Sequence, residues 1–180
     1  PVFLSVFFTV ALLSVTAQDT VYFKNGLMAN GLHRYGREAL YTDLLAYQLY
    51  NNMLQQPREN SIAGVNDEQQ EIKWVIVHAD SLNSFRMPRQ NGMRRQGFFN
   101  SGYLYVTYNA DKEKTALLNT RGGSSVYVNG EPHTGDPYAS GWLYIPVKLK
   151  KGLNEFYIRS GFRTTASLIF PVKPVGLNTE

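Results

Sequence analysis

Residues 125–159 of this 180-residue chain read SVYVNGEPHTGDPYASGWLYIPVKLKKGLNEFYIR, and this stretch decides the fold class. In Val126-Tyr127-Val128 and Phe156-Tyr157-Ile158, a tyrosine separates two wholly apolar side chains. Successive side chains of a strand point to opposite faces, so this alternation predicts strands that bury their apolar residues on one face. Asn129-Gly130 and Lys150-Lys151-Gly152 connect such runs, because Asn and Gly tolerate the backbone of tight turns. The stretch therefore predicts antiparallel hairpins.

Strand signals continue on both sides of this stretch. Runs rich in β-branched and aromatic residues occupy residues 72–79, 103–108, 115–119, 125–128, 142–147, 154–159 and 167–172. Regular short strands separated by turns are typical of a sandwich. We expect a mainly β fold, an antiparallel β-sandwich over residues 61–172, with loops at 57–71 and 80–102.

One amphipathic helix is expected before the sandwich, over residues 37–56. Leu40, Leu44 and Tyr47 recur at three- and four-residue steps, and Pro57 ends the pattern. In a free-standing domain this apolar stripe should be fully buried, whereas in part of a larger assembly some of it should lie exposed as a patch.

Residues 18–60 as a whole are interpreted as an N-terminal extension that carries this helix. Within it, residues 19–35 hold a short β-prone run followed by Asn25-Gly26 and Asn30-Gly31. Such steps favour a backbone with positive φ, so we expect turns at both.

The first 17 residues have the features of a signal peptide. Residues 2–13 are uncharged and mostly apolar, and Ser14-Val15-Thr16-Ala17 supplies small residues for cleavage. The apolar run is shorter than the roughly 20 residues of a membrane-spanning helix, so we expect no membrane span. A starting Met and a basic n-region are missing, so we expect this chain to be part of a longer one. The protein is expected in the periplasm or outside the cell.

Composition and charge exclude several classes of protein. The chain has no Cys, which excludes disulfide scaffolds, thiolate zinc sites and a Cys nucleophile. Its formal net charge is +4, with basic residues scattered singly or in short groups. A nucleic-acid surface would need a denser basic stripe, so no nucleic-acid partner is expected.

The order of turns within residues 125–159 resembles the galactose-binding-like jelly roll. The matching motifs are Asn129-Gly130-Glu131, Gly135-Asp136-Pro137-Tyr138, Ile145-Pro146-Val147, Lys150-Lys151-Gly152 and Asn154-Glu155. With Trp74 and the expected strand 103–108, the order looks like the N-terminal module of secreted bacterial α/β-hydrolase-type proteins, such as prolyl-oligopeptidase-like enzymes. The resemblance covers roughly residues 70–172.

This resemblance implies a non-catalytic accessory module of a secreted hydrolase. Such a module would dock against a catalytic domain further along the same chain, or present that domain to its substrate. Residues 173–180 include Pro174 and Gly176 and are interpreted as the start of a linker to it. The resemblance also implies a structural calcium ion as a possible cofactor, held by backbone carbonyls, since no DxDxDG loop occurs.

The sequence offers little support for catalysis, so we expect no catalytic residues and no metal-ligating side chains. There is no GxSxG nucleophile elbow, and His33, His78 and His133 are scattered without an HExxH motif. A stand-alone hydrolase is kept as an alternative, tested by turnover.

A carbohydrate-binding module is the other alternative. Sugar sites combine aromatic rings with polar loop side chains, and the candidates here are Arg121, Asp136, Tyr138, Trp142 and Tyr144. We favour a structural interpretation, in which Trp142 and Tyr144 cover the sandwich and Tyr138 fixes its own loop. Asp136 is then expected to accept backbone N–H groups in a turn.

Overall fold

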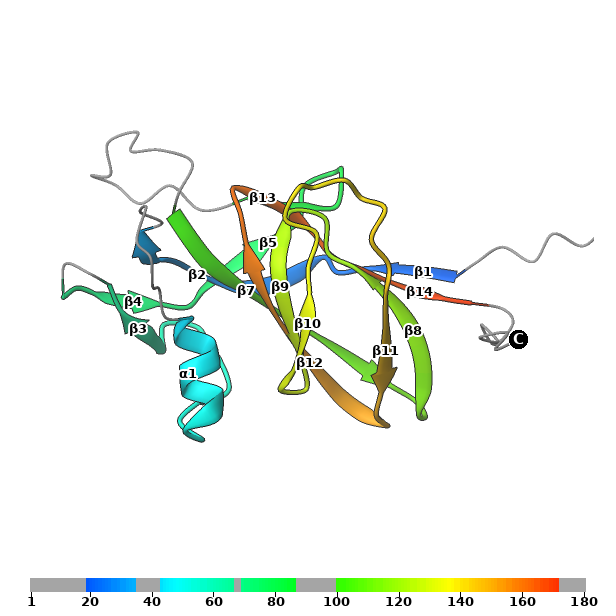
Figure 1. Cartoon of the computed structure of the whole chain (residues 1–180), viewed down its shortest axis with the longest axis horizontal. Coiled ribbons are helices and arrows are strands. Elements are labelled where there is room, and N and C mark those ends of the chain that lie inside the picture. The colour runs from blue at the N-terminus through cyan, green and yellow to red at the C-terminus, as the bar shows by residue number, and fades with distance from the viewer. Residues whose placement is uncertain (1–18, 35–42, 67–68, 87–99, 172–180) are drawn as a thin grey trace, which may run out of the picture.

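A computed structural model describes residues 19–34, 43–66, 69–86 and 100–171, and most of them lie in antiparallel strands (Figure 1). The expected mainly β fold is confirmed, and α1 is the single helix of the described residues. The jelly-roll connectivity implied by the resemblance stays a prediction. The signal peptide and the linker, predicted at 1–17 and 173–180, lie outside the described residues, as do residues 35–42 of the predicted helix.

Ten of the described strands form two sheets. The four-stranded sheet has the order β1 (Asp19–Tyr22), β14 (Ser167–Phe170), β8 (Lys114–Asn119) and β11 (Ile145–Leu149). The six-stranded sheet has the order β10 (Glu131–Thr134), β9 (Gly123–Val128), β12 (Gly152–Ser160), β7 (Asn100–Ala110), β2 (Asn25–Arg34) and β5 (Val75–His78). Two short pairs complete the fold: β13 (Arg163–Thr165) with β6 (Ser84–Arg86), and β3 (Ile62–Val65) with β4 (Glu71–Lys73).

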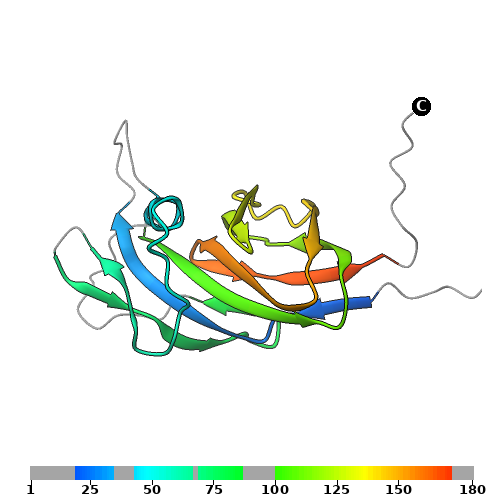
Figure 2. The same cartoon turned by 90° about the horizontal axis from the view of Figure 1, so that it is seen from below.

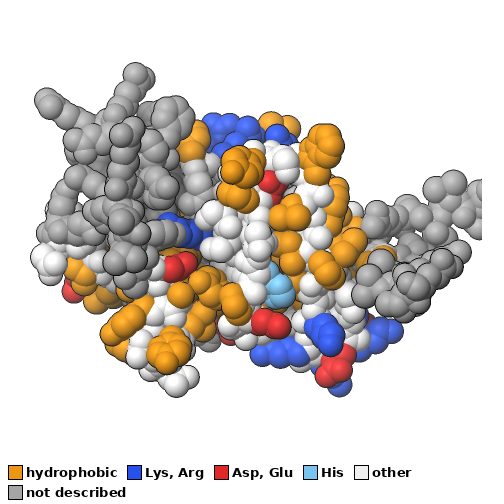
Figure 3. Space-filling model, viewed as in Figure 1, with side chains coloured by type: hydrophobic (Ala, Val, Ile, Leu, Met, Phe, Trp, Pro, Cys, Tyr) orange, Lys and Arg blue, Asp and Glu red, His pale blue; other side chains and the backbone are white. Residues whose placement is uncertain are grey.

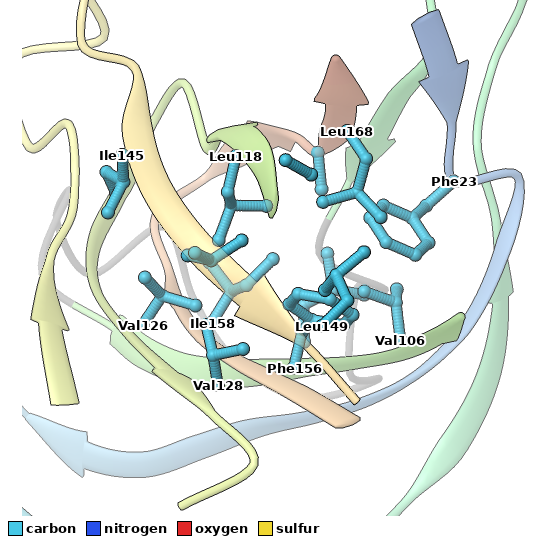
Figure 4. Packing of buried hydrophobic residues seen from close by; sticks show 14 of the residues in the cluster. Phe23, Val106, Leu118, Val126, Val128, Ile145, Leu149, Phe156, Ile158 and Leu168 are labelled. Carbon is cyan, nitrogen blue, oxygen red and sulfur yellow. The ribbon is translucent and has the colours of Figure 1, made fainter. Parts of the chain in front are cut away.

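The main core lies between the two sheets. Phe156 and Ile158 of β12 point toward Leu118 and Leu168 of the other sheet (Figure 4), and all four side chains are fully buried. Burial of a side chain of this size stabilises the fold by about 1.5–3 kcal/mol. The predicted alternation is thereby confirmed for β12, and β9 buries Val126 and Val128 in the same core.

A second core covers the opposite face of the six-stranded sheet. Here β7, β9 and β12 present four buried tyrosines, which are Tyr103, Tyr105, Tyr127 and Tyr157. The covering layer consists of α1 (Leu44–Tyr50), the segment after it and the β3–β4 pair. Figure 2 looks along α1, which lies beside β2 and this pair. The sequence predicted a half-buried sheet, whereas this sheet is buried on both faces where the cover lies.

The helix is shorter than predicted. Asp43 caps its first turn by accepting hydrogen bonds from the backbone N–H groups of Leu45 and Ala46, at 3.1 and 3.3 Å. The helix ends at Tyr50, six residues before the expected end. Asn51 is the C-cap, and both its backbone N–H and its side-chain amide donate to the carbonyl of Tyr47, at 3.1 and 2.8 Å.

The expected strand 72–79 and the two expected loops are wrong in part. The strand is broken at Trp74, so that β4 pairs with β3 while β5 pairs with β2. Trp74 itself is buried in the second core, which explains why the chain changes partner there. The loop predicted at 57–71 contains β3, and the loop at 80–102 contains β6 and the start of β7.

The two Asn-Gly steps form no turns, since both lie within β2. A Cβ at Gly26 would lie 2.7 Å from the carbonyl oxygen of Tyr105, so close contact between strands requires glycine there. Gly31 has φ of 83° and lies where the register with β7 shifts, as in a β-bulge. Because β1 pairs with β14 and β2 lies between β7 and β5, part of the expected extension 18–60 belongs to the sandwich.

Candidate functional site

Large aromatic side chains lie exposed in the segment between β10 and β11. We call residues 137–144 the aromatic loop. Tyr138 is 93% exposed and Trp142 is 83% exposed, while Tyr144 is about half exposed. The expectation that Trp142 covers the sandwich is therefore wrong. The expected strand 142–147 begins only at Ile145, so the aromatic side chains before it are not held against either sheet.

Asp136 anchors the aromatic loop from inside. Its carboxylate is buried and accepts hydrogen bonds from the N–H and hydroxyl of Ser140, both at 3.0 Å, and from the N–H of Gly141 at 2.6 Å. Burial alone would raise the pKa of Asp136, but these bonds and the charge of Arg121 outweigh it and lower the pKa. The predicted turn is confirmed. The carboxylate is engaged within the loop, so we place Asp136 among the supporting residues rather than among the contacts.

Two further polar side chains support the loop from behind. The backbone of Arg121 forms an isolated β-bridge with that of Asp136, and its side chain donates Nε to the carbonyl of Ala139 at 2.8 Å. Asn119, which is buried, donates its amide to the carbonyls of Gly141 and Leu143 at 3.1 and 3.0 Å. The loop is fixed by these side chains and not by Tyr138. Asn119 has no sequence signal of its own, because it lies within an ordinary strand run.

The loop lies at one end of the sandwich, which we call the loop end: residues 80–86, 119–123, 136–144 and 161–165. Backbone hydrogen bonds link these segments in order. Gly122 donates to the carbonyl of Asp136 at 3.1 Å, and Thr165 donates to the carbonyl of Arg121 at 2.9 Å. β13 then pairs with β6, which brings residues 84–86 to the same end.

The loop end also carries arginines and a further aromatic ring. Arg86 and Arg163 both lie 3.4 Å from Oδ2 of Asp80, and Arg163 also donates its Nε to the hydroxyl of Ser84 at 2.8 Å. Phe162 is largely exposed beside Arg163. Figure 3 shows Lys and Arg side chains gathered at the upper edge of the molecule, next to hydrophobic ones. All five predicted candidates therefore lie at the loop end, and four of them, Arg121, Tyr138, Trp142 and Tyr144, are exposed.

The second group of aromatic residues is the covered tyrosine face, which consists of Tyr103, Tyr105, Tyr127 and Tyr157. Tyr103 donates its hydroxyl to Asp43, and Tyr127 donates to the other oxygen of the same carboxylate at 3.2 Å. Tyr105 donates to Glu155 at 2.7 Å and accepts from Gln56 at 3.3 Å. These hydroxyls are used to hold the cover, so this face is structural.

Burial raises the pKa of every tyrosine of the covered face. For Tyr105 and Tyr127 the pKa rises to about 12, with hydrogen bonds and charge from Glu155 and Asp43 adding to the effect of burial. The pKa values of Tyr103 and Tyr157 are raised further, again mainly by burial. These hydroxyls remain protonated donors at neutral pH.

The titratable groups outside these regions are dispersed. His78 ends β5 and bonds to the side chain of Asn25 at 2.8 Å, while His133 lies in β10. Among the residues with described positions, no three His, Asp or Glu side chains come together as metal ligands would. In the same ranges, no helix combines the length and apolar character that a bilayer crossing requires. The calcium ion stays a prediction.

Comparison of this chain with family models, with characterised proteins and with solved structures gives no significant match. The resemblance to galactose-binding-like modules therefore rests on sequence motifs alone, those of residues 125–159 together with Trp74 and the run 103–108.

Proposed function

We propose that this chain is a secreted, non-catalytic accessory module of a hydrolase, and that it presents the enzyme to its substrate by binding carbohydrate through the aromatic loop. The observation that carries the proposal is the exposure of Trp142 and Tyr138 on a loop that buried polar side chains hold in place. The sequence favoured a structural role in which Trp142 covers the sandwich. Because Trp142 is exposed, its position supports a role in ligand binding instead.

The chemistry of sugars suits such a surface. A sugar ring has apolar C–H faces that stack on an aromatic ring, and hydroxyl groups that pair with polar side chains at the edges. Full burial of a ring such as that of Trp142 removes roughly 150–250 Å² from water, worth about 4–6 kcal/mol before the costs of binding. Because Asp136, Arg121 and Asn119 already hold the loop, little ordering cost is added when a ligand binds.

The test is affinity electrophoresis of the 180-residue chain in gels that contain a panel of neutral and acidic polysaccharides. We expect retardation by at least one of them, weakened about tenfold or more in Trp142→Ala and in Tyr138→Ala. The matched control is Tyr50→Ala, which removes an equally exposed ring from α1. An unretarded wild-type chain, or equal retardation of Trp142→Ala, would overturn carbohydrate binding by this loop.

A second role, docking against a catalytic domain, is favoured by α1. The outer side of the helix and the residues after it leave Tyr47, Tyr50 and Met53 more than half exposed, while Leu45 is buried beneath them. Figure 3 shows hydrophobic side chains gathered over α1. The partial exposure is what we expected of a module within a larger assembly.

Docking is tested first by reading the gene on both sides of these residues for a hydrolase domain in the same frame. If one is present, Tyr50→Ala in the full chain should expose the linker to faster limited proteolysis, while Tyr138→Ala should leave the rate unchanged. Unchanged proteolysis in Tyr50→Ala would remove α1 from the docking surface. Esterase, peptidase or glycosidase turnover by residues 18–180 alone would overturn the non-catalytic proposal.

A further inference from the structure

We propose that the carbohydrate bound at the aromatic loop is anionic, because Arg86, Arg121 and Arg163 lie exposed at the same end of the sandwich as the loop. The inference rests on the proposed function and adds the class of ligand to it. The arginines would pair with carboxylate or sulfate groups along the sugar chain while the aromatic rings stack on its sugar rings.

The arginines and the aromatic loop belong to one continuous surface. Arg121 contacts the loop directly, through its Nε on the carbonyl of Ala139, and its own carbonyl accepts from Thr165 of β13. β13 carries Arg163, whose register partner in β6 is Arg86. A polysaccharide that crosses the loop end from Trp142 toward β6 would therefore pass Arg121, Arg163 and Arg86 in that order.

The charge that this end shows to solvent is positive. Two carboxylates lie near the arginines, but Asp136 is 3% exposed and is engaged by backbone N–H groups. Asp80 is also engaged, by the N–H groups of Leu82 and Ser84, and one of its oxygens is shared by two arginines. The side chain of Arg86 is 63% exposed and that of Arg163 is 41% exposed, against 30% for Asp80.

Arginine is suited to this role by its geometry. Its planar guanidinium presents several N–H groups in a fixed fork that matches a carboxylate or a sulfate, and it keeps its charge at every physiological pH. A neutral glycan offers hydroxyl groups to these arginines but cannot form an ion pair with them. The combination of exposed aromatic rings and exposed arginines thus favours an anionic sugar chain over a neutral one.

The experiment compares each anionic polymer with a neutral polymer of closely related backbone. Isothermal titration of the 180-residue chain uses polygalacturonate against its fully methyl-esterified form, and sulfated carrageenan against neutral agarose. We expect each anionic polymer to bind about tenfold or more tightly than its neutral partner, with affinity falling as salt is added. The two pairs distinguish carboxylate from sulfate as the recognised group.

Variants then locate the binding. The double substitution Arg86→Gln with Arg163→Gln should weaken binding of the anionic polymer about tenfold or more, and Arg86→Gln alone should weaken it severalfold. Arg86 is the safer single change, because its contact in the described structure is an exposed ion pair. Circular dichroism confirms that each variant is folded.

A matched control removes the same charge from the opposite end of the sandwich. β12 runs from Gly152, next to Ala110, to Ser160 at the loop end, so the turns that hold Lys112 and Lys150 lie far from the arginines (Figure 1). The double substitution Lys112→Gln with Lys150→Gln should change affinity less than about twofold. An equal loss in this control would show non-specific attraction and overturn the inference.

The remaining outcomes separate this inference from the proposed function. Binding of neutral polymers as tight as that of their anionic partners, and lost in Trp142→Ala, would overturn the anionic class and leave carbohydrate binding intact. If none of these polymers binds, the anionic class is overturned, while carbohydrate binding by the aromatic loop is decided by the polysaccharide panel of the electrophoresis experiment. Anionic binding that survives Trp142→Ala but not the arginine changes would place the ligand on the arginines without the aromatic loop, and would also overturn the inference.

Discussion

Two regions of this molecule are rich in large aromatic side chains, and the rings are treated in opposite ways. On the covered tyrosine face the rings pack on one another, and the ring centroids of Tyr105 and Tyr157 lie 4.8 Å apart. The hydroxyls of Tyr103 and Tyr127 donate hydrogen bonds to Asp43 of the cover. In the aromatic loop, Tyr138 and Trp142 lie almost wholly in solvent. The first arrangement stabilises the fold, and the second leaves rings available to a ligand.

The difference shows that ring content alone does not mark a binding surface. What distinguishes the regions is where the polar side chains are used. Asp43 and Gln56 form hydrogen bonds with tyrosine hydroxyls, and these bonds hold the covering layer against the rings. In the loop, Asp136 and Asn119 bond to the backbone, which fixes the chain while the rings stay free. Substitutions in the two regions should therefore separate stability from binding.

The largest effect is expected for Trp74→Ala. Trp74 is buried in the second core and meets Tyr105 edge-on with ring centroids 6.4 Å apart, so the change leaves a cavity and costs about 3–5 kcal/mol of unfolding free energy. The matched change Trp142→Ala should alter stability by no more than about 0.5 kcal/mol. Urea unfolding of both proteins measures the contrast, and similar losses would abolish the distinction between the regions.

Asp43→Ala should have the next largest effect. It removes the cap of α1 and leaves the hydroxyls of Tyr103 and Tyr127 without their acceptor, which together cost about 2–3 kcal/mol. Asp43→Asn keeps an oxygen acceptor and a capping side chain, so it should lose less. Urea unfolding gives the order of stability, and equal losses in the two variants would show that the acceptor oxygens do not hold the cover.

Alkaline pH should loosen the covered tyrosine face. Tyr105 and Tyr127 lose their protons near pH 10.0 in the unfolded chain but only near 12 in the folded one. Their contribution to stability is complete below pH 10 and is lost as the pH rises toward 12, because the unfolded state then binds fewer protons. Unfolding midpoints measured across this window should fall, and they should fall less steeply in Tyr127→Phe. A flat profile would contradict the burial of these hydroxyls.

Asp136→Ala removes the carboxylate that holds the aromatic loop and should cost about 1–2 kcal/mol of stability, less than Trp74→Ala and Asp43→Ala, since the N–H groups of Ser140 and Gly141 can turn to water. Binding should weaken because the rings lose their fixed positions. Because the pKa of Asp136 is lowered in the folded protein, the stability it contributes is present above about pH 4 and is lost as the pH falls through its folded-state pKa. Thermal unfolding between pH 2 and 6 measures it. Unimpaired binding in Asp136→Ala would separate the loop's order from its function.

Several structural features were predictable from local pattern. The alternation in Phe156-Tyr157-Ile158 assigned each side chain to the correct face, because a strand has a period of two whatever its partners. The turn at Asp136 was predictable because a carboxylate followed by small residues accepts nearby backbone N–H groups. The aromatic loop was recognised as a candidate from its composition.

Other features depended on distant parts of the chain. Residues 72–79 look like one strand in the sequence but are interrupted at Trp74. The part before Trp74 pairs with β3 and the part after it pairs with β2. The exposure of Trp142 follows from the late start of β11 and from the bonds of Asn119, a residue 23 positions earlier in the sequence. Local pattern contains no information about either partner.

The sequence by itself determined the alternation of faces, the hairpin turn at Asn129-Gly130 and the mainly β fold, since these depend on neighbours a few residues apart. The hairpin expected at Lys150-Lys151-Gly152 is wrong, because that turn joins β11 of the four-stranded sheet to β12 of the six-stranded sheet. Only the tertiary structure decided which aromatic rings are covered and which are exposed. That choice depends on whether a cover from residues 43–74 can reach a given ring and satisfy its hydroxyl, as it does on the tyrosine face. Tyr138 and Trp142 lie at the end of the sandwich, beyond that cover, and are left in water.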